Sequence, residues 1–197
     1  MTIKREGDMK IGTYAYDEFI GKVKEFHGSI APGIVAGGVM VDIAKANLPE
    51  GEFFDVICES QHCLPDAVQL LTPCTIGNRW LKIAETSRYA LTFYNKYTGE
   101  GIRVYLDAKK LGNWPAIRAW FLKEKPKKEQ SLDRILDEFR RAGTAIYGTE
   151  RVTVKPSFIA SPEKMHSAIG LCPCCGEAFR TSLGERCRAC QGKGPYS

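Results

Sequence analysis

The sequence predicts an α+β fold, with helices packed on a mainly antiparallel sheet and a small treble-clef-like or ribbon-like zinc finger at the C-terminus. Three observations support this prediction. Apolar positions with helical spacing occur near both ends of the main domain, short runs of aromatic and β-branched residues occupy its middle, and two Cys-x-x-Cys pairs close the chain. This grouping is typical of α+β proteins and not of doubly wound sheets. We place the core domain at residues 1–160 and the finger at 161–197.

Two helices are expected before the first strand. Residues 13–26 form an amphipathic pattern that begins with Thr13 as a plausible N-cap and ends at Gly28. The following run, "IVAGGVMVDIAKANL", is apolar on almost every face, which indicates a buried helix. Gly33 and Gly37 lie on one side of this helix, so another backbone can approach it closely there.

The middle of the chain contains the strands. "EFFDVICE" reads as a buried strand, and the short helix "PDAVQLLT" follows it, with Pro65 near its start and Pro73 at its end. "WLKIAE", "ALTFYN" and "IRVYLD" are three further strands. The glycines of "KYTGEG" suit a hairpin loop between the last two strands, which predicts antiparallel pairing.

A second amphipathic helix and a linker complete the core domain. Ser131 is expected to cap a helix over residues 132–147, because apolar residues recur there at helical spacing. "RVTVKPSF" adds a further strand, and "IASPEKMHS" has the composition of a linker to the finger.

Composition narrows the classes of protein that the chain can belong to. With 44% hydrophobic and 26% charged residues, the chain is not disordered. No stretch approaches the roughly 18 to 20 apolar residues that span a bilayer, and no export signal is evident, so we expect a cytoplasmic protein with reduced cysteines. Residues 108–130 hold seven Lys or Arg and two Glu. We favour a solvated connector whose aromatic residues dock on the core over a nucleic-acid patch.

The C-terminal cysteines are the strongest motif. Two Cys-x-x-Cys pairs, separated by eleven residues, supply four thiolates for one tetrahedral Zn²⁺. The ligands are Cys172, Cys175, Cys187 and Cys190, whereas Cys174 is expected to point away. Four thiolates close the coordination shell, so this zinc is structural and the main function lies elsewhere.

The cysteines of the core domain call for a different interpretation. Cys63 and Cys74 flank the short helix, whose ends lie about 12 Å apart, beyond the ~7 Å between Cα atoms that a disulfide tolerates. Cys63 precedes the helix N-terminus, where the helix dipole is expected to lower its pKa. Burial of Cys58, Cys63 and Cys74 as small apolar residues is the alternative, and the two remain open.

Three stretches together resemble the family formed by the E subunit of formylmethanofuran dehydrogenase. They are "FHGSIAPGIVAG", "ESQHCLPDAVQLLTPCTIGN" and "YALTFYNKYTGEGIRVYL", and the four-cysteine tail is similar to the finger of some members. The residues that match the family pattern are His27, Gly28, Pro32, Gly33, Cys63, Asp66, Gln69, Cys74, Thr75 and Gly77. The sequence departs from the pattern at Ser29, where a second His is expected, at Ala31, where a Cys is expected, and at Pro73, where Gly is usual.

The resemblance implies an α+β core that dimerises, with a polar cleft near the His and Cys loops, in organisms that use molybdenum or tungsten enzymes of one-carbon metabolism such as methanogenesis. The cleft candidates, without an assigned catalytic role, are His27, His62, Cys63, Asp66 and Gln69. Because Ser29 and Ala31 remove two soft ligands, we expect a degenerate site. A second zinc held by His27 and Cys63, beside one structural zinc per chain, remains open.

Three functions follow from these features. We prefer an accessory or regulatory subunit of a larger oxidoreductase complex, acting as a homodimer whose finger contacts a partner protein. The second is a zinc-finger protein that binds nucleic acid or acts in transcription, which the finger's net charge of +2 does not favour. The third is an enzyme with a Cys63 nucleophile, for which only His27 or His62 offers a base.

Overall fold

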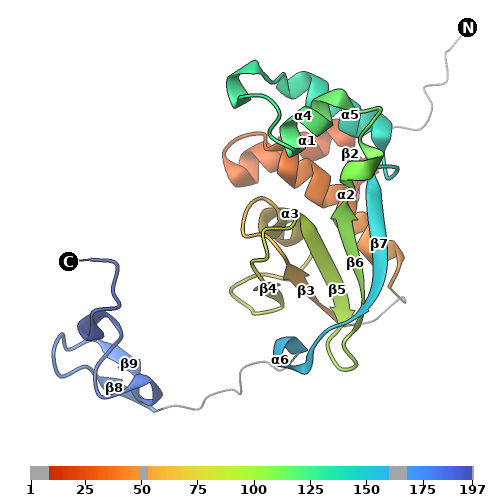
Figure 1. Cartoon of the computed structure of the whole chain (residues 1–197). Helices are drawn as coiled ribbons and strands as arrows, with labels where there is room; N and C mark the ends of the chain where they lie inside the picture. Colours follow the sequence, from red (N-terminus) through yellow and green to blue (C-terminus); the bar gives the residue numbers. More distant parts are fainter. Residues whose placement is uncertain (1–8, 49–52, 160–167, 197) are drawn as a thin grey trace, which may run out of the picture. The chain divides into compact units, whose positions relative to one another are not determined.

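The chain folds into two compact units. A computed structural model describes residues 9–48, 53–159 and 168–196. The units are Met1–Ile159, with a five-stranded sheet, and Ala160–Ser197, with a two-stranded sheet (Figure 1). Apart from Ile159, the linker predicted at residues 159–167 lies outside the described residues.

The elements of the first unit follow the predicted mixture of helices and strands. Its helices are α1 (Tyr16–His27), α2 (Pro32–Ala46), α3 (Leu64–Leu71), α4 (Pro115–Phe121), α5 (Leu132–Ala142) and α6 (Pro156–Ile159), with the 3-10 turns η1 (Ala108–Lys110) and η2 (Lys127–Glu129). Its strands are β1 (Lys10–Ile11), β2 (Tyr14–Ala15), β3 (Phe54–Cys58), β4 (Leu81–Ile83), β5 (Ala90–Asn95), β6 (Glu100–Leu106) and β7 (Tyr147–Thr153). The second unit contains β8 (Ile169–Leu171), β9 (Ala178–Arg180), η3 (Thr181–Leu183) and η4 (Ala189–Gln191).

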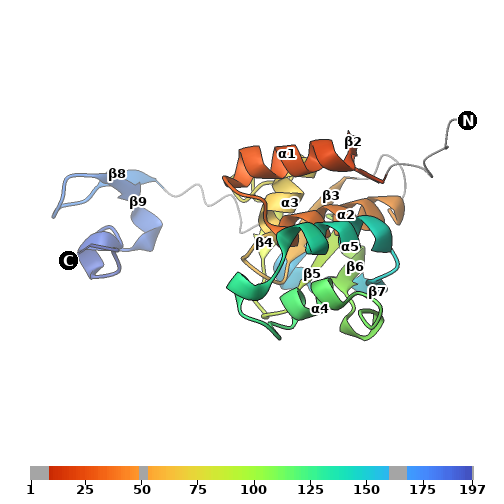
Figure 2. The same ribbon diagram turned by 90° about the horizontal axis from the view of Figure 1, so that it is seen from above.

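The large sheet has the strand order β4-β3-β5-β6-β7. Neighbouring strands are antiparallel except for β3 and β4, which run parallel and are connected through α3. The predicted α+β class with a mainly antiparallel sheet is therefore confirmed. Figures 1 and 2 show α1, α2, α4 and α5 gathered together, whereas α6 lies apart from them near the turn between β5 and β6.

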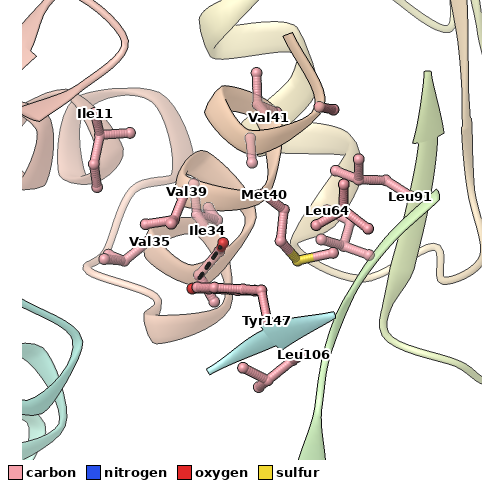
Figure 3. Packing of buried hydrophobic residues seen from close by; sticks show 14 of the residues in the cluster. Ile11, Ile34, Val35, Val39, Met40, Val41, Leu64, Leu91, Leu106 and Tyr147 are labelled. Carbon is pink, nitrogen blue, oxygen red and sulfur yellow. Dashed lines mark hydrogen bonds between the residues drawn. The ribbon is translucent and has the colours of Figure 1, made fainter. Parts of the chain in front are cut away.

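Helix α2 forms the centre of the core, as its apolar sequence predicts. It packs against β5, β6 and α3, and most of its side chains are buried. The Tyr147 hydroxyl donates a hydrogen bond of 3.2 Å to the Ala36 carbonyl oxygen, which ties β7 to this helix (Figure 3). A Cβ on Gly37 would lie 2.7 Å from the Ala67 Cβ, so glycine is needed for α3 to approach this closely, as predicted.

The N-terminal prediction is partly wrong. Helix α1 begins at Tyr16 and not at residue 13, because the preceding residues form the β1–β2 hairpin. Gly12 adopts a φ of 61° in the turn of this hairpin, and its N–H donates to Asp42 Oδ2 at 2.7 Å. Thr13 therefore does not cap the helix. The predicted end of α1 at Gly28 is confirmed by a left-handed φ of 82°.

The basic segment 108–130 is more ordered than a connector. It contains α4, and Trp120 and Phe121 pack edge-on against the ring of Tyr89. Glu138 Oε2 accepts hydrogen bonds from two N–H groups in the first turn of α4, each at 2.9 Å. The predicted docking of the aromatic residues on the core is confirmed, whereas α4 itself was not predicted.

Helix α5 is shorter than predicted. Ser131 Oγ accepts a hydrogen bond from the Arg134 N–H, which confirms the predicted cap. The helix ends at Ala142 instead of residue 147, because Gly143 adopts a φ of 53° and the chain then enters β7. This early end gives β7 the seven residues with which it pairs along β6.

No single helix in the described part of the chain is long and apolar enough to cross a membrane. Helices α1 and α2 meet the length and composition only when taken together, and the chain bends by 119° between them.

Candidate functional site

Cys63 lies at a strained turn between β3 and α3. It is the N-cap residue of α3, with φ 60° and ψ −47°. The Leu64 N–H donates across it to the His62 carbonyl oxygen at 2.6 Å, which closes a γ-turn with positive φ. This conformation is costly for a residue with a Cβ, and such strain is concentrated at functional sites. The turn fixes the direction of the Cys63 side chain.

The side chain of Cys63 lies against the first turn of α2. A Cβ on Gly33 would lie 2.8 Å from both the Cβ and the Sγ of Cys63, and 3.0 Å from the Tyr89 Oη. The Tyr89 hydroxyl donates a hydrogen bond to the Gly33 carbonyl oxygen. Glycine at this position therefore makes room for the thiol, and the close approach predicted at Gly33 is confirmed.

The environment of Cys63 does not favour its thiolate. Burial raises the pKa of the Cys63 thiol, and the negative charge of Asp66 raises it further. The predicted lowering of this pKa at the helix N-terminus is therefore wrong. Desolvation and a nearby carboxylate outweigh the dipole of a helix that has only eight residues.

Cys74 and Cys58 are packing residues. Cys74 is 1% exposed, and its Sγ contacts the Phe54 carbonyl oxygen at 3.7 Å. Burial raises its pKa to about 11, and burial also raises the pKa of Cys58. Every cysteine is free in the structure, which confirms that Cys63 and Cys74 are not bridged.

His27 and Asp66 form a pair beside Cys63. The His27 Nδ1 lies 2.7 Å from Asp66 Oδ2, and about a third of each side chain is exposed. His27 ends α1 and Asp66 lies in the first turn of α3, so each helix end favours the charge of its residue. When Asp66 holds Nδ1, the other ring nitrogen, Nε2, remains for a ligand or a proton.

The other two cleft candidates have different contacts. His62 lies beside Glu85, whose pKa is lowered mainly by backbone hydrogen bonds from Gln61 and Ser87 and to a smaller degree by His62. Gln69 Oε1 accepts a hydrogen bond of 3.4 Å from the Ile76 N–H, so it supports the loop between α3 and β4.

The cleft thus combines the His27–Asp66 pair with Cys63 and Tyr89. Sequence reasoning missed Tyr89, because a lone tyrosine before a strand carries no local signal. In the described residues of the core unit, no three His, Cys, Asp or Glu side chains place their ligand atoms within reach of one metal ion. A second zinc at His27 and Cys63 therefore remains a prediction.

The four predicted finger cysteines do converge. Cys172, Cys175, Cys187 and Cys190 place their sulfur atoms within 4.8 Å of one another. The sulfurs of Cys175 and Cys187 are 3.8 Å apart. A zinc tetrahedron with Zn–S bonds of about 2.3 Å has sulfurs separated by about 3.8 Å, so the donor set fits the metal.

Local structure explains this convergence. Cys172 directly follows β8, and Gly176 adopts a φ of 77° in the turn after the first pair. Cys190 lies in the single turn η4. Cys174 lies outside the cluster, with its Sγ 4.0 Å from the Arg186 Nη1.

Comparisons with known proteins match both units. The family described as "FmdE, Molybdenum formylmethanofuran dehydrogenase operon" matches residues 26–154, and the FmdE treble clef zinc finger matches residues 163–197. A crystal structure of an FmdE-like protein of tungsten formylmethanofuran dehydrogenase, from Syntrophus aciditrophicus, is 47% identical. It aligns with a TM-score of 0.89, covering 98% of this chain and 100% of that one.

A curated relative from Archaeoglobus fulgidus is named a probable S-adenosyl-L-methionine-binding protein. It is 33% identical over 138 residues, which is 62% of this chain. The chain spans 36% of the length of that relative.

Proposed function

Because the chain belongs to the FmdE family, we propose that it is an accessory or regulatory protein of molybdenum or tungsten formylmethanofuran dehydrogenases. In this proposal the finger contacts the partner enzyme, and the core carries a degenerate cleft. The protein works in the cytoplasm, where its cysteines stay reduced, as part of one-carbon metabolism such as methanogenesis. Family membership and the close likeness to the Syntrophus protein support this setting.

One observation carries the accessory role. The cleft retains a paired His27 and Asp66 beside Cys63, but no group of three ligands gathers there among the described residues. Ser29 and Ala31 stand in the loop before α2, where a second imidazole and a second thiolate would complete a set of soft ligands. Two ligands hold Zn²⁺ poorly, so the cleft suits recognition better than metal catalysis.

Metal content tests the degenerate cleft. We expect one zinc per chain in the wild-type protein and two in the double variant Ser29→His, Ala31→Cys, which restores both soft ligands. Adding Cys63→Ser to that variant should return the content to one. Two zinc ions in the wild-type protein, with one lost on Cys63→Ser, would point to a metal site in the core and contradict the accessory role.

Co-purification tests the partner. A tagged wild-type chain should retain a molybdenum or tungsten oxidoreductase from its own cell extract. The Cys172→Ser, Cys187→Ser variant should lose that enzyme, whereas His27→Ala should keep it, since the finger makes the contact. Recovery of the enzyme by the variant that lacks the finger cysteines would assign the contact to the core instead.

The assembly that we propose is a homodimer formed through the core unit. The family resemblance supports it, and light scattering of the chain truncated after residue 159 tests it. A dimeric mass is expected, and a monomeric mass would move the interface to the finger.

Nucleic-acid binding is the weaker candidate function. The described finger carries four basic and two acidic residues, a net side-chain charge of +2. Four thiolates and one Zn²⁺ add −2, which cancels that charge. Trp120 and Phe121 pack on Tyr89, so they form no stacking platform. Retention on DNA or RNA that falls steeply with salt would revive this function.

A further inference from the structure

The face of the sheet opposite α2 contains a second candidate site. Val56, Phe93 and Ile102 are paired across β3, β5 and β6, and all three belong to the core beneath α2. Because side chains alternate along a strand, the next row across the sheet faces the other way. This row consists of Ile57, Thr92, Arg103 and Glu150.

A hollow of about 470 Å³ lies over this row, and we call it the sheet hollow. All four residues of the row line it, and the chain from Val152 to Lys155, together with Phe158 of α6, forms one wall. Its volume is within the roughly 300–1,000 Å³ of small-molecule sites. The sheet hollow is separate from the cleft, since neither Cys63 nor His27 lines it.

A neutralised ion pair occupies the sheet hollow. Glu59 is 6% exposed and accepts hydrogen bonds from Arg103 Nε at 2.5 Å and Arg103 Nη2 at 3.2 Å. Arg88 Nε lies 2.7 Å from the same carboxylate. Burial alone would raise the pKa of Glu59, but the contacts with Arg103, Thr86 and Arg88 together lower it. Glu59 therefore stays ionised and its charge is already compensated.

Three donors in the sheet hollow remain unused. Thr92 is 5% exposed, and its hydroxyl has no hydrogen-bond partner among the described residues. Within the same part of the chain, Lys155 has no carboxylate partner, and Arg88 is paired only through its Nε. The cations Arg88, Arg103 and Lys155 outnumber the carboxylates Glu59 and Glu150, which gives the lining a net charge of +1.

The remaining lining is apolar. Val152, Val154 and Phe158 form one side, and Ile57 and Ala84 lie on the floor. The Phe158 carbonyl oxygen accepts hydrogen bonds from Lys82 Nζ at 2.6 Å and from the Tyr94 hydroxyl at 3.3 Å, so α6 is held on the sheet. The apolar wall is therefore preformed.

We propose that the sheet hollow binds a small organic anion with an apolar body, such as a carboxylate or a phosphate ester. Arg88 and Lys155 hold the anionic group, and the Thr92 hydroxyl donates to a polar atom of the ligand. Val152, Val154 and Phe158 cover its apolar body. An inorganic anion would leave these apolar side chains in water. This site goes beyond the proposed accessory role and does not depend on it.

A fluorescent amphipathic anion, 8-anilinonaphthalene-1-sulfonate, is the direct probe. Titrated into the full-length, zinc-loaded protein, it should bind at one saturable site per chain. Arg88→Gln and Lys155→Gln should each weaken binding about tenfold, and Thr92→Val should weaken it about threefold. Lys22→Gln on α1 removes a charge far along the chain and should leave the affinity unchanged. Wild-type affinity in both charge variants, with unchanged thermal unfolding, would overturn the proposal.

Competition identifies the anion and tests a protein partner in its place. Phenyl phosphate and benzoate should displace the probe, whereas equal concentrations of inorganic phosphate or benzyl alcohol should not. Displacement by inorganic phosphate alone would reduce the site to a simple anion contact and overturn the proposal. Light scattering should give the same mass for wild-type protein and for Arg88→Gln. A change in mass with loss of probe binding would show that a second copy covers the sheet hollow, which also overturns it.

Discussion

The core unit and the finger are stabilised by different forces. In the core unit, thirty buried residues form one apolar cluster around α2. In the finger, Cys172 alone is buried among residues 168–196. Burial of apolar surface offsets the loss of chain entropy in the first unit. The second unit lacks this term, so the energy of its fold comes from the metal.

This difference separates graded from all-or-none behaviour. A core with many contacts loses stability in steps as single side chains change, because each contact supplies a small part of the total. A finger with four ligands and one ion loses its fold when the site is lost. We expect the changes described next to test this contrast, and their effects decrease from the first to the last.

Removal of zinc should unfold the finger and leave the core folded. Structural Zn²⁺ contributes about 10–16 kcal/mol in finger peptides, far more than any single core contact. Amide NMR signals of residues 168–196 should collapse on addition of a chelator, while the thermal unfolding of the core stays unchanged. Cys174→Ser is the matched control and should keep the finger folded. Dispersed finger signals in metal-free Cys172→Ser, Cys187→Ser protein would contradict this account.

Glu59→Gln should destabilise the core by about 3 kcal/mol, because Arg103 loses its buried charge partner. Urea unfolding measures the change, and the finger should be unaffected. The lowered pKa of Glu59 means that its stabilising contribution is present above its unfolded pKa of about 4.3 and is lost as the pH falls through the folded pKa.

The pH dependence supplies the control for Glu59. Wild type and Glu59→Gln should therefore converge in stability at acid pH and differ most near neutrality. An equal difference at acid and neutral pH would show that packing, and not charge, causes the loss.

Gly33→Ala should destabilise the core by about 1–3 kcal/mol, because the added Cβ collides with Cys63 and Tyr89 at the cleft. Gly21→Ala in α1 is the matched control. A Cβ there meets no atom within 4 Å, and we expect it to stabilise the protein by about 0.4–1 kcal/mol. Thermal unfolding of both variants measures the pair, and equal midpoints would contradict the tight packing of Cys63 on α2.

Cys63 should be alkylated about tenfold faster than Cys74, since Cys63 is the less buried of the two. Both thiols have raised pKa values, so both rates should be low at neutral pH and rise with pH. Asp66→Asn should speed the reaction of Cys63 by removing a negative charge. Peptide mapping of zinc-loaded protein measures each rate. Equal rates would identify both thiols as packing residues and the cleft as vestigial.

Local patterns in the sequence predicted most of the fold and all of the zinc site. The apolar run of α2, the glycines between β5 and β6, and the cysteine spacing each act over a few residues. The cleft depends on contacts between distant residues, such as His27 with Asp66, which the family resemblance indicated and periodicity did not. The pKa of Cys63 was predicted wrongly, because its burial follows from the tertiary packing around the thiol.

Two elements were missed for different reasons. The β1–β2 hairpin has strands of two residues, too short for an alternating pattern to appear. Helix α4 begins with Pro115, a start signal that the surrounding basic residues concealed.

Strand β7 has consequences for self-association. It ends the sheet order, so within the described sheet one side of its seven residues has no neighbouring strand. Such an edge is a template on which further chains can add and grow into fibres. Glu150 and Arg151 occupy its middle, and two copies meeting antiparallel at either residue would place like charges opposite each other. The charged centre of β7 therefore acts as a guard against aggregation, and its replacement by valines would expose the chain to that hazard.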